Sequence, residues 1–218
     1  MPPEAALPGW AETVAEYYRA VRTLATELMP VYARALRVDK THFDGQFDRP
    51  CWCIRLNHYP PPDGSGAALG IPPHADGDFT TFLLTDDQPG LSLQRADGEW
   101  VHLKEPPRAG APHSMLVNSG NSLQRLSNGA FPSTMHTASC YRPGKPRFSV
   151  PFFWSPSVDA VIEPLAPWVT ADCPSRYEAR SSGKVESSGK VGFKIVDPLR
   201  KDARADTFDI AAAAHAMA

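Results

Sequence analysis

The sequence lacks a long hydrophobic run and an excess of either charge. No apolar segment approaches the ~20 residues that a membrane-spanning helix requires, so we expect no membrane partner. Acidic and basic residues nearly balance, with a formal net charge of -2, which removes the electrostatic basis for binding nucleic acid. A chain of 218 residues is long enough for one domain with a sizeable core.

Cysteine is also scarce and has no regular spacing. The four residues are Cys51, Cys53, Cys140 and Cys173, and no CxxC pair occurs. The first residues, MPPEAALPGW, have neither the basic nor the apolar segment of a secretory signal. We therefore interpret the cysteines as free thiols and expect a cytoplasmic protein. A soft-metal site at Cys51 and Cys53 would need a second thiolate pair, which is absent.

Proline, in contrast, is abundant, and its position separates two kinds of pattern. Residues 11–38 carry apolar side chains at helical spacing, which Pro30 should kink or split. We expect a short second helix near residues 40–47. From residue 51, short apolar runs alternate with proline- and glycine-containing turns. They predict eight strands, near residues 51–59, 79–84, 91–95, 99–103, 113–118, 121–126, 134–141 and 147–154.

These runs predict a fold class that is mainly β. No helical run separates consecutive strands, which excludes a parallel βαβ arrangement and favours an antiparallel sandwich, jelly roll or small barrel. We divide the chain into a helical segment packed on the core (1–50), a β domain (51–165) and a C-terminal extension (166–218). In the extension, the repeated SSGKV predicts an exposed flexible loop and the final AAAAHAMA a terminal helix.

Potential metal ligands occur in the stretch GIPPHADGDFTTFLL, residues 70–84. His74 and Asp76 point to the same side if the backbone there is extended. Alone, such a pair is typical of a solvated turn. His136, however, lies in a later strand-like run, and two histidines with one carboxylate are the ligand set of non-haem Fe(II) oxygenases. A zinc hydrolase would use similar ligands and a nearby general base.

A second pair with the same spacing, Arg147 and Ser149, favours iron over zinc. The planar guanidinium can bind a carboxylate through two hydrogen bonds, and the serine hydroxyl lies on the same strand face. Together they can hold one end of a dicarboxylic co-substrate whose other end chelates the metal. Phe153 has the same strand parity, so we expect it in the pocket. Taken alone, Arg147 would be interpreted as part of a surface ion pair.

The block from Leu56 to Pro156 resembles the 2-oxoglutarate- and Fe(II)-dependent dioxygenases of the isopenicillin N synthase-like family. The similarity lies in the segments LNHYPP, PPHADGDFTTFLL, GLSLQRADGEWVHL, SNGAFPSTMHT and RFSVPFF, in the family's order. Residues 11–47 are similar to the long helix that precedes the family's core. The resemblance implies a double-stranded β-helix (jelly-roll) core with N-terminal helices packed outside, and it implies the cofactors Fe(II), 2-oxoglutarate and O2.

The resemblance also assigns roles to residues of this sequence. It implies three catalytic iron ligands: His74, Asp76 and His136. It implies that four residues bind or steady 2-oxoglutarate: Arg147, Ser149, Tyr59 and Asn57. The implied reaction is hydroxylation, desaturation or cyclisation of a small organic substrate, with release of succinate and CO2. Neither the identity of that substrate nor the oligomeric state follows from the sequence.

Departures from the family leave two other functions open. Family members usually carry a further N-terminal region, so this chain is a fragment, a shortened product or a minimal relative. Asn121 stands where aspartate is usual and Thr137 where arginine is common, and both positions would support the ligands. One alternative is an oxidase resembling isopenicillin N synthase or aminocyclopropanecarboxylate oxidase, which does not consume 2-oxoglutarate. The other is a truncated, catalytically silent binding domain.

Overall fold

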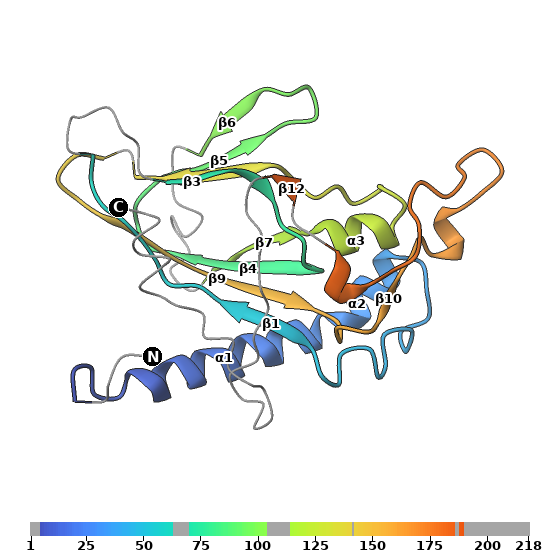
Figure 1. Ribbon diagram of the computed structural model, residues 1–218, viewed down its shortest axis with the longest axis horizontal. Coiled ribbons are helices and arrows are strands. Elements are labelled where there is room, and N and C mark those ends of the chain that lie inside the picture. Colours follow the sequence, from blue (N-terminus) through green and yellow to red (C-terminus); the bar gives the residue numbers. More distant parts are fainter. Residues whose placement is uncertain (1–4, 63–69, 104–113, 141, 186–187, 190–218) are drawn as a thin grey trace. The chain divides into compact units, whose positions relative to one another are not determined.

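The computed structural model describes residues 5–62, 70–103, 114–140, 142–185 and 188–189. The chain divides into two compact units, Met1–Gly45 and Gln46–Ala218. The first contains the two N-terminal helices, and the second contains the strands (Figure 1). Within the described residues, no helix is both long and apolar enough to cross a membrane. The packing of the helical segment on the β domain stays a prediction.

The N-terminal unit consists of α1 (Trp10–Glu27) and α2 (Met29–Ala35). The break falls where Pro30 predicts it: proline occupies the first turn of α2, where its missing N–H removes no helical hydrogen bond. The expected helix near residues 40–47 is wrong, because this segment forms turns. The Asp39 carboxylate accepts hydrogen bonds from the N–H and hydroxyl of Thr41, which competes with helix formation.

Two five-stranded antiparallel sheets form the core of the second unit and confirm the mainly β jelly-roll fold (Figure 1). One sheet has the order β1-β9-β4-β7, with β2 also paired to β9. Its strands are β1 (Cys51–Ile54), β2 (Asn57–Tyr59), β4 (Thr80–Thr85), β7 (Leu116–Ser119) and β9 (Arg147–Ser155). The other has the order β12-β3-β8-β5-β6. Its strands are β3 (Gly70–Ala75), β5 (Leu91–Gln94), β6 (Trp100–His102), β8 (His136–Ser139) and β12 (Ser188–Gly189).

Strand β9 separates an aromatic layer from a polar pocket. Side chains alternate along a strand, so Phe152 and Trp154 lie on one face and Arg147, Ser149 and Phe153 on the other. Phe152 is fully buried and stacks with Trp154 at a ring distance of 5.9 Å. Because the polar residues occupy only one parity, β9 buries a large aromatic surface and still presents charged groups to the pocket.

One predicted strand is wrong: residues 121–126 form α3 (Asn121–Leu126). Its first N–H groups, from Asn121 and Ser122, bond to the carbonyl groups of Asp76 and Gly77. These tertiary hydrogen bonds therefore satisfy N–H groups that have no acceptor within the helix itself. The helix ends before Asn128, which has a φ of 51°, and a left-handed residue of this kind is a common helix stop. The SNG segment is thus a helix signal that the strand prediction overlooks.

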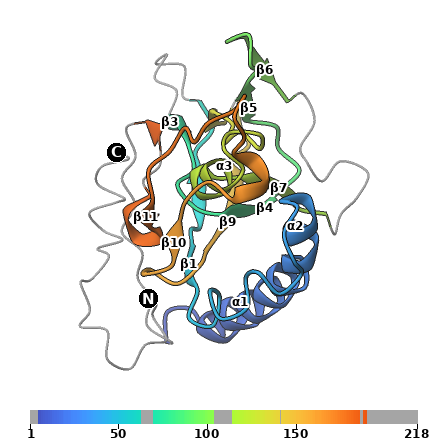
Figure 2. The same ribbon diagram turned by 90° about the vertical axis from the view of Figure 1, so that its right-hand side faces the viewer.

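The C-terminal extension is tied to α3 (Figure 2). It carries β11 (Arg180–Ser181) and two 3-10 turns, Ala166–Trp168 and Ser182–Lys184, and β11 pairs with β10 (Val161–Ile162) of the β domain. The side-chain amide of Asn128 donates to the carbonyl oxygens of Trp168 and Pro174. The first SSGKV copy overlaps β11 and a 3-10 turn, where we expected only a loop. The expected terminal helix lies outside the described residues.

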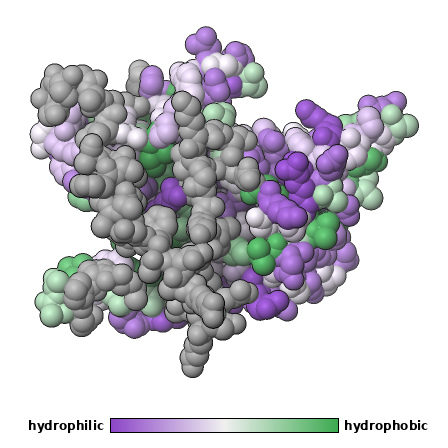
Figure 3. Space-filling model, in the orientation of Figure 1, coloured by the Kyte–Doolittle hydropathy of each residue, from purple (hydrophilic) through white to green (hydrophobic). Residues whose placement is uncertain are grey.

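Hydrophobic residues on the face shown in Figure 3 form small patches between hydrophilic ones. Exposed apolar side chains of the β unit include Leu56, Val117 and Phe148. Apolar side chains scattered in this way are normal for a protein surface. The visible, described part of this face therefore gives no indication of a broad apolar docking surface.

Candidate metal centre

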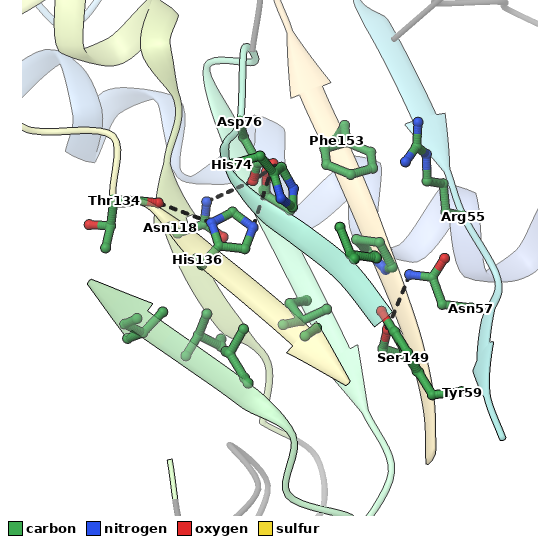
Figure 4. A pocket seen from close by; sticks show the side chains of 18 of the residues that line it. Arg55, Asn57, Tyr59, His74, Asp76, Asn118, Thr134, His136, Ser149 and Phe153 are labelled. Carbon is green, nitrogen blue, oxygen red and sulfur yellow. Dashed lines mark hydrogen bonds and ion pairs between the residues drawn. The ribbon is translucent and has the colours of Figure 1, made fainter. Parts of the chain in front are cut away.

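Paired strands bring the three expected metal ligands together (Figure 4). His74 lies near the end of β3, Asp76 follows that strand, and His136 begins β8. In the β3–β8 ladder, His74 is directly opposite His136. Their ring centroids are 4.3 Å apart, and one ligand atom from each of the three residues lies within 4.8 Å of the others. The described residues contain no other such group of three or more.

Backbone carbonyl groups orient both imidazoles. The Nδ1 atom of His74 lies 2.9 Å from the Pro72 oxygen, and that of His136 lies 3.0 Å from the Thr134 oxygen. A carbonyl oxygen only accepts, so each Nδ1 carries the proton and each Nε2 presents a lone pair. These Nε2 atoms lie 3.6 and 3.8 Å from Asp76 Oδ1. Burial, followed by the neighbouring His136, lowers the pKa of His74, which favours the neutral imidazole that binds metals.

The two carboxylate oxygens of Asp76 have different surroundings. Oδ2 accepts hydrogen bonds from Thr81 Oγ1 at 2.6 Å and Asn118 Nδ2 at 2.9 Å. Oδ1 is buried and has no hydrogen-bond donor among the described residues. Burying an unsatisfied carboxylate oxygen is costly. A cation held between Oδ1 and the two Nε2 atoms would remove that cost, so the donor set fits a divalent metal ion.

The loop after β3 is fixed by α3 and its preceding glycine. The Asp76 carbonyl oxygen accepts the N–H of Asn121 at 2.8 Å. A side chain at Gly120 would place its Cβ 2.0 Å from the Asp78 carbonyl oxygen, so only glycine fits there. Thr137, the second residue that departs from the family pattern, donates its hydroxyl to the Ile71 carbonyl at 2.6 Å. Both departures therefore lie in contact with the segment that carries the ligands.

The other end of the same pocket carries a buried positive charge. Arg147 is 1% exposed, and its guanidinium lies 4.9 Å from the centre of the Tyr59 ring. Its Nε and Nη1 atoms have no hydrogen-bond acceptor among the described residues. Ser149 Oγ accepts from Asn57 Nδ2 at 3.2 Å and lies 3.5 Å from the Tyr59 hydroxyl. A buried guanidinium is costly without an anion, so this group fits a carboxylate.

A single pocket is lined by all seven expected site residues and by Phe153. The remaining lining is largely apolar, from Ile71, Leu83, Leu91, Leu93, Leu116, Ala138 and Pro151. The sequence interpretation missed four polar residues of this pocket: Arg55, Thr81, Asn118 and Thr134. Arg55 has the same strand parity as Asn57 and Tyr59, so alternation along the strand could have placed it in the pocket. Asn118 depends on the pairing of β4 with β7, where it is opposite Thr81, and the sequence pattern does not give that register.

The fold and the site together define a class of protein. It is a jelly roll in which two histidines and one carboxylate converge on a potential metal position. A buried guanidinium lies in the same pocket. Residues 50–156 match the family described as the 2OG-Fe(II) oxygenase superfamily. The chain therefore belongs to this superfamily, whose cofactors are Fe(II) and 2-oxoglutarate.

Relatives and solved structures agree with this assignment. The chain is 32% identical to jasmonate-induced oxygenase 3 of Arabidopsis thaliana, over 77% of this chain and 46% of the relative. It is 35% identical to kihadalactone A synthase LFS of Citrus sinensis, over 84% and 55% of the two chains. The structure of JOX2 in complex with 2OG, Fe and JA superposes with a TM-score of 0.70 at 32% identity, covering 81% and 51%.

A second solved structure is similar in fold to nearly the same degree. A 2OG-Fe(II) oxygenase family protein from Caulobacter crescentus superposes with a TM-score of 0.69 at 29% identity, covering 83% of this chain and 58% of that one. The chain thus spans about half the length of the relatives it matches. The part of the chain that matches the family model contains the whole candidate site.

Proposed function

We propose that this chain is an Fe(II)- and 2-oxoglutarate-dependent dioxygenase that oxidises a small organic substrate and releases succinate and CO2. One observation carries the proposal: a single pocket holds two unsatisfied buried groups of opposite charge, Asp76 Oδ1 and the Arg147 guanidinium. A metal ion would satisfy the first and a carboxylate the second. A co-substrate with a metal-chelating end and a distal carboxylate suits both.

In this proposal, the iron is held by His74, Asp76 and His136. The bound metal, together with 2-oxoglutarate and O2, supplies the oxidising chemistry. The backbone acceptors of the two Nδ1–H groups keep the imidazoles aimed at the metal position. Thr81 and Asn118 hold one carboxylate oxygen of Asp76 and leave the other for the metal.

Four residues at the other end have the role of binding 2-oxoglutarate. Arg147 and Ser149 bind its distal carboxylate, with the guanidinium forming two parallel hydrogen bonds. Asn57 donates to the Ser149 hydroxyl, which frees the serine O–H to donate to the carboxylate. Tyr59 supports the guanidinium with its ring face. The apolar lining of the pocket excludes water from the reacting groups.

The names of the relatives support a small organic substrate. They include a jasmonate-induced oxygenase, a flavonol synthase/flavanone 3-hydroxylase and gibberellin 20 oxidases. We also propose a cytoplasmic location, for which the support is that all four cysteines are free.

Two alternatives are weaker. An oxidase that does not consume 2-oxoglutarate would also carry the Arg147–Ser149 pair, so that pair does not separate the two enzymes; Asn57 and Tyr59, which lie beside Ser149, favour 2-oxoglutarate. A silent binding domain is favoured by the half-length coverage of the relatives and by Asn121 and Thr137. Against it, the Thr137 hydroxyl and the backbone N–H of Asn121 both bond to the ligand-bearing segment.

The proposal can be tested by adding Fe(II) and 2-oxoglutarate to the chain without oxygen. We expect the visible charge-transfer band of the iron–2-oxoglutarate chelate, and its loss in His74→Ala. With oxygen, succinate should form together with loss of a substrate. A folded wild-type chain that gives no band would favour the silent domain. A band with substrate oxidation but no succinate would favour the oxidase.

A further inference from the structure

A segment without regular secondary structure, residues 131–135, leads from α3 to the metal ligand His136. The chain reverses direction after the helix, at Asn128, and Phe131 then donates its N–H to the Ser127 hydroxyl at 2.9 Å. The segment therefore returns along the helix that the chain has just left. Because it ends at His136, the contacts that hold it also affect the position of that ligand.

A side chain of α3 holds this segment by its backbone. The Oε1 atom of Gln124 accepts the N–H of Ser133 at 2.8 Å. The next residue, Thr134, provides the carbonyl oxygen that lies 3.0 Å from His136 Nδ1 (Figure 4). Gln124 thus holds the chain one residue before the carbonyl group that orients a metal ligand.

The same serine contacts the other segment that carries metal ligands. Ser133 Oγ donates to the Asp76 carbonyl oxygen at 3.2 Å. That oxygen also accepts the Asn121 N–H at 2.8 Å, and its two lone pairs allow both bonds. Ser133 therefore connects the segment before His136 with the loop that carries Asp76, through a contact that is not part of the β3–β8 ladder.

This connection lies beside an interruption of the ladder. The pairing of β3 with β8 shifts register between Ile71 and His74. The two residues in between, Pro72 and Pro73, have no N–H to donate to a neighbouring strand. Ladder hydrogen bonds alone therefore constrain the two ligand-bearing strands less at this end than a regular pairing would, and a bond from outside the ladder adds constraint where the ligands meet.

We propose that Gln124 and Ser133 are positioning residues of the metal centre. Together they fix the segment before His136 relative to the Asp76 loop. Neither is among the described residues that line the pocket, so they act through the carbonyl groups of Thr134 and Asp76. Residues that orient metal ligands typically contribute roughly 10- to 100-fold to metal affinity. This inference rests on the proposed function, because it takes the three converging side chains as metal ligands.

The test compares variants that each remove a hydrogen bond from this segment. Gln124→Met keeps a side chain of similar length and removes the acceptor, and Ser133→Ala removes the donor to Asp76. Each should lower the affinity of the full chain for Co(II), measured by anaerobic titration, by about 10-fold. Gln124→Glu keeps an acceptor oxygen and should bind Co(II) within about threefold of wild type. Ser119→Ala is the matched control: it removes a bond to Pro132 of the same segment and should bind Co(II) as wild type does.

A second measurement separates positioning from a loss of stability. The visible absorption of bound Co(II) depends on the type and geometry of its ligands. At saturating Co(II), we expect the spectrum of Gln124→Met to move toward that of His136→Ala, while Gln124→Glu and Ser119→Ala keep the wild-type spectrum. Urea unfolding of the metal-free chain should change about equally in Gln124→Met and Ser119→Ala, because each loses one neutral hydrogen bond.

Several results would overturn the proposal. One is a Co(II) affinity within about twofold of wild type in Ser133→Ala, which tests the same connection through a smaller change if Gln124→Met does not fold. Another is an equal loss in Ser119→Ala, or an affinity that follows the free energy of unfolding across all variants; either would leave the segment with a structural role only. A third is a Gln124→Glu chain as weak as Gln124→Met. A wild-type chain that binds no Co(II) would refute the proposed function instead, before any variant is compared.

Discussion

The two ends of the pocket are built in opposite ways. At the metal end, each ligand side chain is oriented by a hydrogen bond at its non-ligating atom. Carbonyl groups accept from the two histidine Nδ1 atoms, and Asp76 Oδ2 accepts from Thr81 and Asn118. At the arginine end, the Arg147 guanidinium has a ring face beside it but, among the described residues, no acceptor for Nε and Nη1. The metal end is therefore preorganised through hydrogen bonds, and the arginine end through packing.

This difference predicts how substitutions at the two ends change ligand affinity and protein stability. Removing a metal ligand should destroy binding at one end without changing the fold much, because the supporting hydrogen bonds are spread over several residues. Removing the guanidinium should weaken binding at the other end and also relieve a cost, since a buried charge without a partner destabilises the empty protein. At the metal end, affinity should thus fall with little change in stability, whereas at the arginine end affinity should fall while the stability of the empty protein rises.

The largest expected effect is at the metal end. His136→Ala removes one of three ligands, and we expect Fe(II) or Mn(II) affinity to fall by more than ~100-fold, which exceeds the roughly 10- to 100-fold typical of supporting residues. The measurement is metal titration under anaerobic conditions. His58→Ala is the control: His58 is exposed, stacks on Phe148 at 4.9 Å and faces away from the pocket. Equal losses in both variants would contradict the assignment.

Next is Arg147→Met, which separates the two ends most clearly. The affinity for 2-oxoglutarate should fall about 100-fold, as expected for the loss of charge-assisted hydrogen bonds. Metal affinity should not change. The empty variant should be more stable than wild type by about 1 kcal/mol, because a buried unpaired charge is replaced by an apolar chain. Urea unfolding measures the second effect; a lower stability would show that Arg147 is satisfied in the empty protein.

A smaller effect should follow from removing a residue that orients a metal ligand. Asn118→Ala leaves Thr81 as the remaining donor to Asp76 Oδ2 among the described residues, so the carboxylate is less well oriented. We expect a loss of about 10-fold in metal affinity, with 2-oxoglutarate affinity reduced only through the metal. Ser119→Ala is the neighbouring control, since its hydroxyl donates to the Pro132 carbonyl and not to the site. A metal affinity unchanged in Asn118→Ala would mean that Thr81 alone suffices.

The two ends also differ in how far the sequence predicts them. Strand parity places Arg147, Ser149 and Phe153 on one face, because alternation in a strand depends only on local geometry. The strand that carries His74 was missed. Its segment contains Pro72 and Pro73, which lack the N–H that a ladder uses, and the structure accommodates them with a register shift between Ile71 and His74.

Contacts distant in sequence explain the remaining errors. The α3 segment was predicted as a strand because it is a short run between turn-forming residues, whereas its first turn is fixed by carbonyl groups of the loop after β3. Thr81 and Asn118 become neighbours only through the β4–β7 register. Residue type and local spacing therefore predict the ligands and the anion-binding pair, but not the residues that orient them.

The smallest expected effect tests whether packing organises the arginine end. Asn57→Ala removes one neutral hydrogen bond to Ser149 Oγ, so 2-oxoglutarate affinity should fall about fivefold. Tyr59→Phe should change it by less than about twofold, because the hydroxyl contact is 3.5 Å long, at the limit of a hydrogen bond, and the ring remains beside Arg147. If Tyr59→Phe were as damaging as Asn57→Ala, hydrogen bonding and not the ring face would hold this end in place.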